Sequence, residues 1–117
     1  MQNYKDLKVW EKAHSFTLKV YEYASQFPKE EMYSLTSQLK RSASSIPANI
    51  AEGCGKNSKQ EFAHFLNIAL GSANESEYFV ILARDLTYLS EQNFNTLFNI
   101  INEVKGMLIA LINKVRA

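Results

Sequence analysis

Residues 58–89 read SKQEFAHFLNIALGSANESEYFVILARDLTYL, and their apolar side chains recur with the period of an α-helix. At about 100° per residue, one side of that helix collects Phe62, Phe65, Leu66, Ala69, Ala73, Ser76, Val80, Ala83 and Leu86. Ser58, with Glu61 three residues later, matches the capping box that often begins a helix. We therefore expect one long helix over residues 58–89.

Three further apolar stripes with the same period predict helices over about residues 7–27, 34–54 and 91–115. Pro28 follows the first, Gly53 and Gly55 mark the end of the second, and Ser90 is placed to cap the last. Four helices joined by short loops predict an all-α fold, an antiparallel up-down-up-down four-helix bundle. We expect residues 1–117 to form this one domain.

Pro47 lies inside the second predicted helix. A proline there has no N–H for the carbonyl of Ala43, and its ring crowds the preceding turn, so we expect a kink or break. Two interpretations remain open. The kink is either a tolerated bend in a buried helix or a device that aims residues 49–52.

The amino-acid composition limits the fold class and the cellular compartment that we expect. The chain has 117 residues, of which 46% are hydrophobic, and its 13 basic and 12 acidic side chains give a net charge of +1. Four glycines and two prolines are too few for the frequent turns of an all-β fold. A single cysteine, Cys54, excludes an internal disulfide and suits a reducing compartment. With no apolar run of about 18 residues, we expect a cytoplasmic protein without membrane contact.

A metal site is one hypothesis that the sequence suggests. Di-metal four-helix bundles use two Glu-x-x-His pairs and two further glutamates, and the candidate ligands here are Glu11, His14, Glu52, Glu61, His64 and Glu103. On a helical wheel these side chains do not converge, and Glu61 already has a role as the capping carboxylate. Cys54 falls on a core face, where a buried thiol is unreactive. We expect no metal, no cofactor and no enzymatic activity.

Two predicted helices carry more apolar surface than one bundle can bury. A second stripe, away from the core face, contains Leu7, His14, Leu18 and Tyr21 on the first helix, and Ile68, Phe79, Leu82, Leu86 and Leu89 on the third. Aligned apolar stripes on long helices indicate a partner surface. We expect a homo-oligomer whose contacts include Leu7, Leu18, Tyr21, Ile68, Phe79, Leu82 and Leu86. Gly71, in mid-helix at a cost of about 1 kcal/mol, suggests close packing of another helix.

The second predicted helix also bears a row of polar residues beside its core face, here called the polar stripe: Gln38, Arg41, Ser45, Asn49 and Glu52. Arg41 could pair with Glu75 of the third helix or with a carboxylate of another subunit. The alternative is a solvated helix face without a partner.

Four lysines of the first segment share one side of the predicted helix, and we call them the lysine row: Lys5, Lys8, Lys12 and Lys19. Residues 1–60 hold nine basic and six acidic side chains, whereas residues 61–117 hold four and six. Such a row could follow a phosphate backbone, a contact that is sensitive to salt and indifferent to sequence. The alternative is that these lysines only confer solubility.

Four segments of the chain identify a family. They are YKDLKVW (4–10), LTSQLKR (35–41), SIPANIAEG (45–53) and FLNIALGS (65–72). They resemble the bacterial four-helix-bundle proteins encoded in intervening sequences of 23S ribosomal RNA genes. A related branch contains the accessory proteins of diversity-generating retroelements, which are pentameric barrels of bundles that bind reverse transcriptase and nucleic acid.

The resemblance implies a non-enzymatic, pentameric bundle whose role involves structured RNA. The partners that it implies are further copies of the chain, RNA or DNA, and another protein such as a reverse transcriptase. Two alternatives remain open: a protein-binding adaptor without affinity for nucleic acid, and a metal-dependent bundle enzyme. The lysine row is the expected nucleic-acid contact, and the polar stripe is the expected contact of an adaptor.

Overall fold

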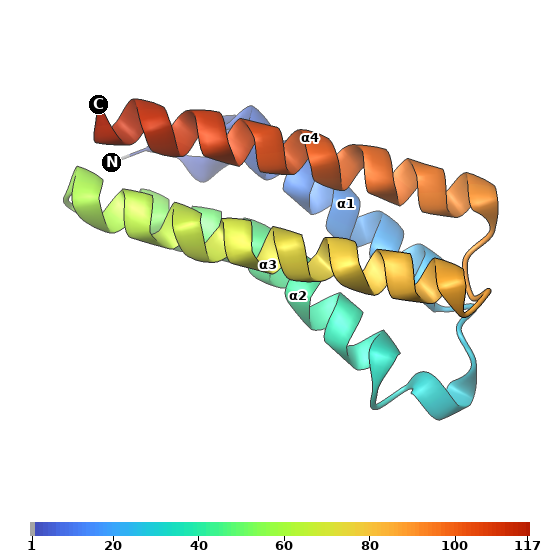
Figure 1. Cartoon of the computed structure of the whole chain (residues 1–117). Coiled ribbons are helices and arrows are strands. Elements are labelled where there is room, and N and C mark those ends of the chain that lie inside the picture. Colours follow the sequence, from blue (N-terminus) through green and yellow to red (C-terminus); the bar gives the residue numbers. More distant parts are fainter. Residues whose placement is uncertain (1) are drawn as a thin grey trace.

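The computed structural model describes residues 2–117 and contains four long helices (Figure 1). Helix α1 spans Lys8–Ala24, α2 Leu35–Cys54, α3 Lys59–Asp85 and α4 Glu91–Arg116. Two short 3-10 helices, η1 (Tyr4–Asp6) and η2 (Lys29–Glu31), precede α1 and α2. With no strand in residues 2–117, the predicted all-α fold is confirmed.

The four helices form a square in which each packs against two neighbours. The adjoining pairs are α1 with α2, α2 with α3, α3 with α4, and α4 with α1; the diagonal pairs do not adjoin. Consecutive helices run in opposite directions, so both chain ends emerge at the same end of the bundle (Figure 1). The outer faces of α1 and α3 therefore look toward opposite sides of the molecule.

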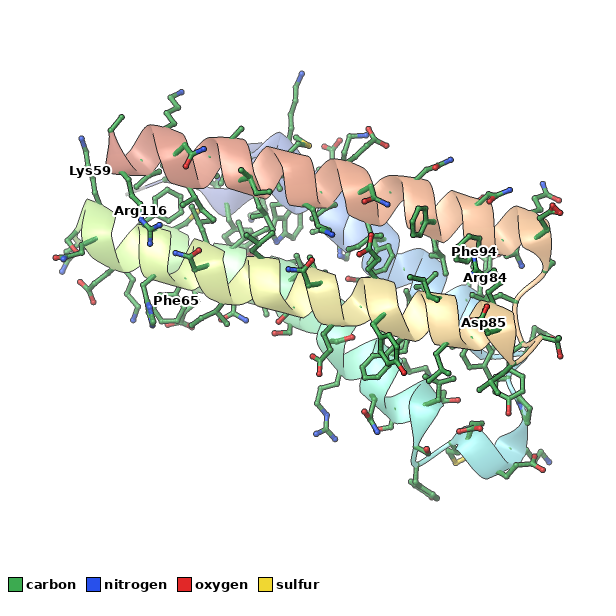
Figure 2. All side chains as sticks on the ribbon, viewed as in Figure 1. Lys59, Phe65, Arg84, Asp85, Phe94 and Arg116 are labelled. Atoms are coloured by element: carbon green, nitrogen blue, oxygen red, sulfur yellow. The ribbon has the colours of Figure 1, made fainter. Side chains whose placement is uncertain are left out.

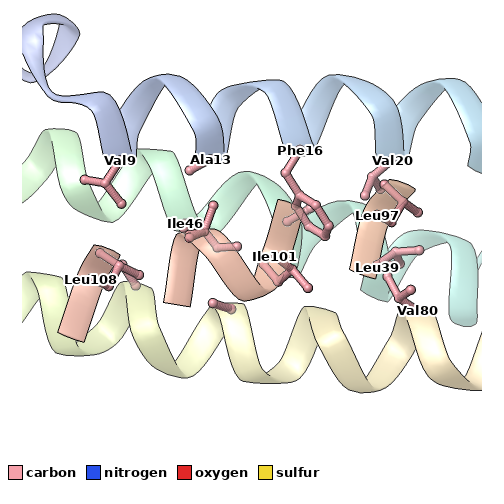
Figure 3. Packing of buried hydrophobic residues seen from close by; sticks show 14 of the residues in the cluster. Val9, Ala13, Phe16, Val20, Leu39, Ile46, Val80, Leu97, Ile101 and Leu108 are labelled. Carbon is pink, nitrogen blue, oxygen red and sulfur yellow. The ribbon is translucent and has the colours of Figure 1, made fainter. Parts of the chain in front are cut away.

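The core is a continuous column of apolar side chains contributed by all four helices. Figure 3 shows Phe16 of α1 and Ile101 of α4 pointing toward one another, with Ile46 of α2 beside them. All three are fully buried. Close-packed aliphatic side chains from four stripes of helical period explain why these segments assemble as a bundle.

Helix α3 ends four residues before the predicted boundary at Leu89. The Tyr88 N–H donates to the Ala83 carbonyl at 2.8 Å, and the Thr87 N–H donates to Arg84 at 2.9 Å, the pattern of a Schellman cap. Thr87 occupies the left-handed position with φ 66°. Sequence reasoning missed this end because glycine or asparagine usually holds that position. Leu89 then turns inward and is only 7% exposed, so it belongs to the core.

Of the expected kink or break at Pro47, the break does not occur, because helix α2 is continuous through this residue. The Ala43 carbonyl, which Pro47 leaves without its helical partner, accepts a hydrogen bond from the Thr17 hydroxyl of α1 at 3.1 Å. The same hydroxyl lies 2.9 Å from the Ala13 carbonyl. A side chain of the neighbouring helix thus satisfies the backbone group that the proline frees. In residues 2–117, no helix combines the length and the hydropathy that a membrane span requires.

Candidate nucleic-acid interface

The structure divides the lysine row. Lys12 Nζ lies 3.3 Å from Glu103 Oε2 of α4, so an acidic side chain neutralises the middle of the row. Lys19, two turns further along α1, is half-buried. Lys5 and Lys8 are exposed at the start of the chain, where Lys5 also lies 5.8 Å from the ring centre of Tyr4. The row therefore presents no unbroken line of cations to a phosphate backbone.

Lys5 and Lys8 instead belong to a larger group of cations at one end of the bundle, where α1 and α3 begin and α2 and α4 end. Within three residues of these helix ends, or in the segments that flank them, lie six basic and four acidic side chains. We call this surface the basic end, and its cations are Lys5, Lys8, Lys56, Lys59, Lys114 and Arg116. Figure 2 shows Lys59 and Arg116 side by side there.

The opposite end has the reverse charge and is called the acidic end. By the same criterion it holds five acidic and two basic side chains. Arg84 Nε lies 3.0 Å from Asp85 Oδ1, and its guanidinium lies 4.4 Å from the ring centre of Phe94 (Figure 2). The bundle is therefore polarised along its length, a feature that a net charge of +1 conceals.

Glu31 has a structural role at the acidic end. It accepts a hydrogen bond from the Tyr88 hydroxyl at 2.9 Å and one from the Leu35 N–H at 3.3 Å. The hydrogen bond to Glu31, together with burial and the nearby negative charges, raises the pKa of Tyr88 above its usual range. Glu31 thus caps α2, where Ser34 makes no side-chain cap, and ties α2 to the loop after α3.

Most cations of the basic end are available for a ligand. Lys56 pairs with Glu52, with 3.2 Å between Lys56 Nζ and Glu52 Oε2. The other five cations form no ion pair within residues 2–117. Unpaired cations on adjoining helix ends can each contact a phosphate.

The polar stripe divides into half-buried and exposed parts. Ser45 hydrogen-bonds Ser72 of α3 at 2.9 Å, and the Asn49 amide donates to Ser45, so these residues help to join α2 to α3. One turn away, the Ser76 hydroxyl donates to Ser42 at 2.9 Å inside the same helix pair. The stripe is therefore partly a helix-packing surface, which explains polar residues beside a core face.

Gln38, Arg41 and Glu52 are the exposed members of the stripe. Gln38 and Arg41 line an open groove of about 520 Å³ together with Glu75 and Tyr33. The predicted Arg41–Glu75 ion pair is absent from the described residues, which have four ion pairs. Tyr33 is 92% exposed. Sequence reasoning did not single out this tyrosine, which lies outside the helical stripes.

The predicted oligomer contacts are only partly exposed. Leu18 is 58% exposed and Tyr21 48% on α1, and Lys40 of α2 lies over the Tyr21 ring at 4.9 Å. On the other side of the bundle, Ile68 is 40% exposed, and Leu86 is exposed just after α3. The remaining three predicted contacts are half-buried against the core, contrary to the expectation that they lie away from it: Leu7, Phe79 and Leu82.

Gly71 is exposed on α3, and a Cβ placed on it would meet no atom within 4 Å. The prediction that Gly71 admits another helix is therefore wrong within the bundle. Any close approach at this glycine comes from outside the protomer.

Several of the candidate metal ligands contact other residues rather than one another. His14 stacks on Trp10 with ring centres 5.1 Å apart, and Glu61 receives the Ser58 hydroxyl at 3.3 Å. Glu52 and Glu103 form the lysine pairs described above. Within residues 2–117 no three acidic, histidine or cysteine side chains are placed to hold a metal ion.

Sequence reasoning missed four cations of the basic end: Lys56, Lys59, Lys114 and Arg116. They form two pairs, Lys56 with Lys59 and Lys114 with Arg116, that lie far apart along the chain and share no helix face. The signal that could have found them is topological, because an antiparallel bundle brings the ends of alternate helices together.

These observations define an all-α antiparallel four-helix bundle with a basic and an acidic end. The family model of the 23S rRNA-intervening sequence protein matches residues 5–110, and the chain belongs to this family. Its fold is similar to the crystal structure of a protein of unknown function from the S23 ribosomal protein family of Bacteroides thetaiotaomicron. That pair shares 30% identity over 90% of this chain and 95% of the other, with a TM-score of 0.83. Among curated proteins, none matches this chain.

Proposed function

We propose that this chain is a non-enzymatic, RNA-binding scaffold of the bacterial cytoplasm. The observation that carries the proposal is the basic end, where five cations without ion-pair partners in residues 2–117 come together from the first segment, α3 and α4. Membership of a family named after 23S rRNA intervening sequences supports structured RNA as the ligand. Phosphate contacts by lysine and arginine would provide most of the affinity.

We further propose that the scaffold is a homo-oligomer, with five subunits as the number that the family resemblance implies. Leu18 and Tyr21 on α1 and Ile68 on α3 are exposed apolar residues on opposite sides of the square, and α4 also exposes Ile109. Two different patches that face opposite ways form a head-to-tail contact, which closes into a ring when the rotation between successive subunits closes on itself and otherwise extends into an open filament. A ring would repeat the basic end around one rim and so multiply its charge.

The RNA proposal is tested by charge reversal. Lys8→Glu with Arg116→Glu places two anions in the basic end, whereas Lys29→Glu with Arg84→Glu makes the same charge change at the acidic end. We expect the first pair to abolish retention of a structured RNA at about 150 mM salt, because repulsion replaces attraction. The second pair should leave retention within about twofold of the original chain. Gel-shift titrations over a range of salt concentrations measure both.

The salt series also gives a quantitative check. Each phosphate contact that is lost should reduce the slope of log K against log salt by about 0.7–0.9. Equal losses for both variant pairs would indicate a nonspecific effect of net charge. No binding by the original chain at about 50 mM salt would rule out RNA as the ligand.

A protein-binding adaptor is the second candidate function. The open groove between α2 and α3 favours it, because Arg41 and Glu75 line this groove without pairing to each other and Tyr33 stands almost fully exposed beside them. Exposed tyrosine and arginine are the residues that most often dominate protein interfaces. An adaptor would keep its partner when the basic end is reversed, and would lose it on Tyr33→Ala with Arg41→Ala.

A further inference from the structure

A cavity of about 430 Å³ opens within the basic end, between the segment before α1 and the ends of α2, α3 and α4. Half-buried apolar side chains form one part of its wall: Leu7, Phe62, Leu111 and Val115. Cys54 lies among them, and burial raises the pKa of its thiol, which therefore stays neutral. This part of the cavity suits an apolar or aromatic group.

The remaining wall is polar and cationic. It contains Gln2, Lys56, Asn57, Ser58, Lys59 and Lys114. Lys56 forms an ion pair with Glu52 and lies over the Phe65 ring at 5.2 Å. We therefore do not count it among the unpaired cations of the cavity. Lys59 and Lys114 have no ion-pair partner among residues 2–117. The cavity therefore combines an apolar wall with two available positive charges.

We propose that this cavity binds a single nucleotide bearing a terminal phosphate, either free or at the end of an RNA strand. This inference rests on the proposed RNA-binding function and deepens it. A terminal phosphate carries a charge of about −1.5 to −2 near neutral pH, which matches Lys59 and Lys114 better than a carboxylate would. The base would rest against Phe62 and its apolar neighbours.

Two further features fit a nucleotide. The side-chain amides of Gln2 and Asn57 each offer a donor and an acceptor, as the edge of a base requires. The volume lies within the range of roughly 300–1,000 Å³ that small-molecule sites occupy. Gln2, Lys114 and Val115 also lie outside the residues that match the family model, so the family match does not by itself imply this site.

The experiment compares ligands with and without the phosphate. Calorimetry of the full chain with adenosine 5′-monophosphate and with adenosine tests the free nucleotide. Fluorescence titration then uses one short RNA in three versions, with a 5′-phosphate, with a 3′-phosphate, or with hydroxyls at both ends. We expect the monophosphate to bind and adenosine not to, and one phosphorylated RNA to bind about tenfold more tightly than the hydroxyl RNA.

Two pairs of substitutions test whether the preference for a terminal phosphate arises in this cavity. Lys59→Gln with Lys114→Gln should remove the preference for the phosphorylated RNA and the binding of the monophosphate. Lys29→Gln with Arg84→Gln removes the two cations of the acidic end and should preserve both. A preference that survives the first pair as fully as the second would overturn the assignment of the phosphate to this cavity.

The outcomes separate this inference from the proposed function. Equal binding of all three RNAs, with no binding of the monophosphate, would refute the nucleotide site and leave RNA binding intact. Binding of the monophosphate with no affinity for any of the RNAs would support the cavity as a site for a free nucleotide and refute the RNA scaffold.

Discussion

At the scale of single residues, Thr17 and Pro47 form a matched pair across two helices. Thr17 is buried within an otherwise apolar face of α1, where a hydroxyl without a partner would be costly. Its hydroxyl lies 2.9 Å from the Ala13 carbonyl and 3.1 Å from the Ala43 carbonyl, whose usual helical donor is missing at Pro47. The Thr17 hydroxyl therefore offers the Ala43 carbonyl a donor in place of the N–H that Pro47 lacks.

We expect Thr17→Val to lower the free energy of unfolding by about 1–3 kcal/mol, because the shape is retained while the Ala43 carbonyl stays buried without its donor. Pro47→Ala restores an N–H at the position that serves this carbonyl. In the Pro47→Ala background, Thr17→Val should therefore cost distinctly less. Urea unfolding of the four chains in this double-mutant cycle measures the coupling. Equal costs in both backgrounds would show that the hydrogen bond to Ala43 contributes nothing.

At the scale of elements, the junction of α2 and α3 depends on a close approach at Gly53. A Cβ on this residue would lie 3.0 Å from the Cβ of Phe65 and 3.1 Å from the ring of Phe62. A side chain at this position would be tighter than an ordinary contact, so Phe62 or Phe65 would have to shift by a few tenths of an ångström to admit it.

Gly53→Ala should destabilise the bundle by about 1–3 kcal/mol, since overpacking forces α2 and α3 apart. Gly55→Ala is the matched control, because a Cβ there meets only the Glu52 carbonyl oxygen at an ordinary 3.5 Å. Thermal unfolding followed by circular dichroism compares the two variants. Equal midpoints would contradict the tight contact at Gly53.

The helices themselves could be predicted from sequence, whereas some of their ends could not. The four stripes of period 3.6 arise because each helix buries one face, and this pattern is visible without coordinates. Ser58 and Ser90 also cap their helices as predicted, accepting from Glu61 and Asn93. The end of α3 at Asp85 was not predictable, since it depends on the positive φ of Thr87, and a β-branched residue seldom adopts one.

At the scale of the whole molecule, the charge distribution was the least predictable feature. The lysine row follows from local spacing, but its interruption by Glu103 depends on how α1 meets α4. The basic end and its cavity arise where four chain segments come together, and no local pattern links them. Sequence reasoning therefore found two cations of the candidate surface, Lys5 and Lys8. It placed them in a row along the first helix, whereas they belong to a cluster at one end of the bundle.

The proposed assembly can be tested with two glycines. Gly71 of α3 and Gly106 of α4 are both exposed in mid-helix, and a Cβ on either would meet nothing within 4 Å. Replacement by alanine should stabilise each isolated protomer by about 1 kcal/mol, because alanine is the better helix former. We expect only Gly71→Ala to weaken the oligomer, because α3 and not α4 carries the proposed contact.

Analytical ultracentrifugation over a series of protein concentrations measures the assembly. Leu18→Glu on α1 should dissociate the oligomer outright, since the contact would bury its charge. A monomeric original chain at micromolar concentration would rule out the assembly. Equal effects of Gly71→Ala and Gly106→Ala on the assembly would show that α3 does not form the contact.

Gln2, near the start of the chain, and Val115, near its end, line the same cavity at the basic end. An affinity tag or fluorescent fusion at either terminus therefore sits beside the surface proposed to hold RNA, and a polyhistidine tag could itself alter binding there. The opposite pole, around Lys29–Glu31, offers the better point of attachment. A cysteine introduced there would tether the protein to a sensor chip with its cationic face turned toward the solution.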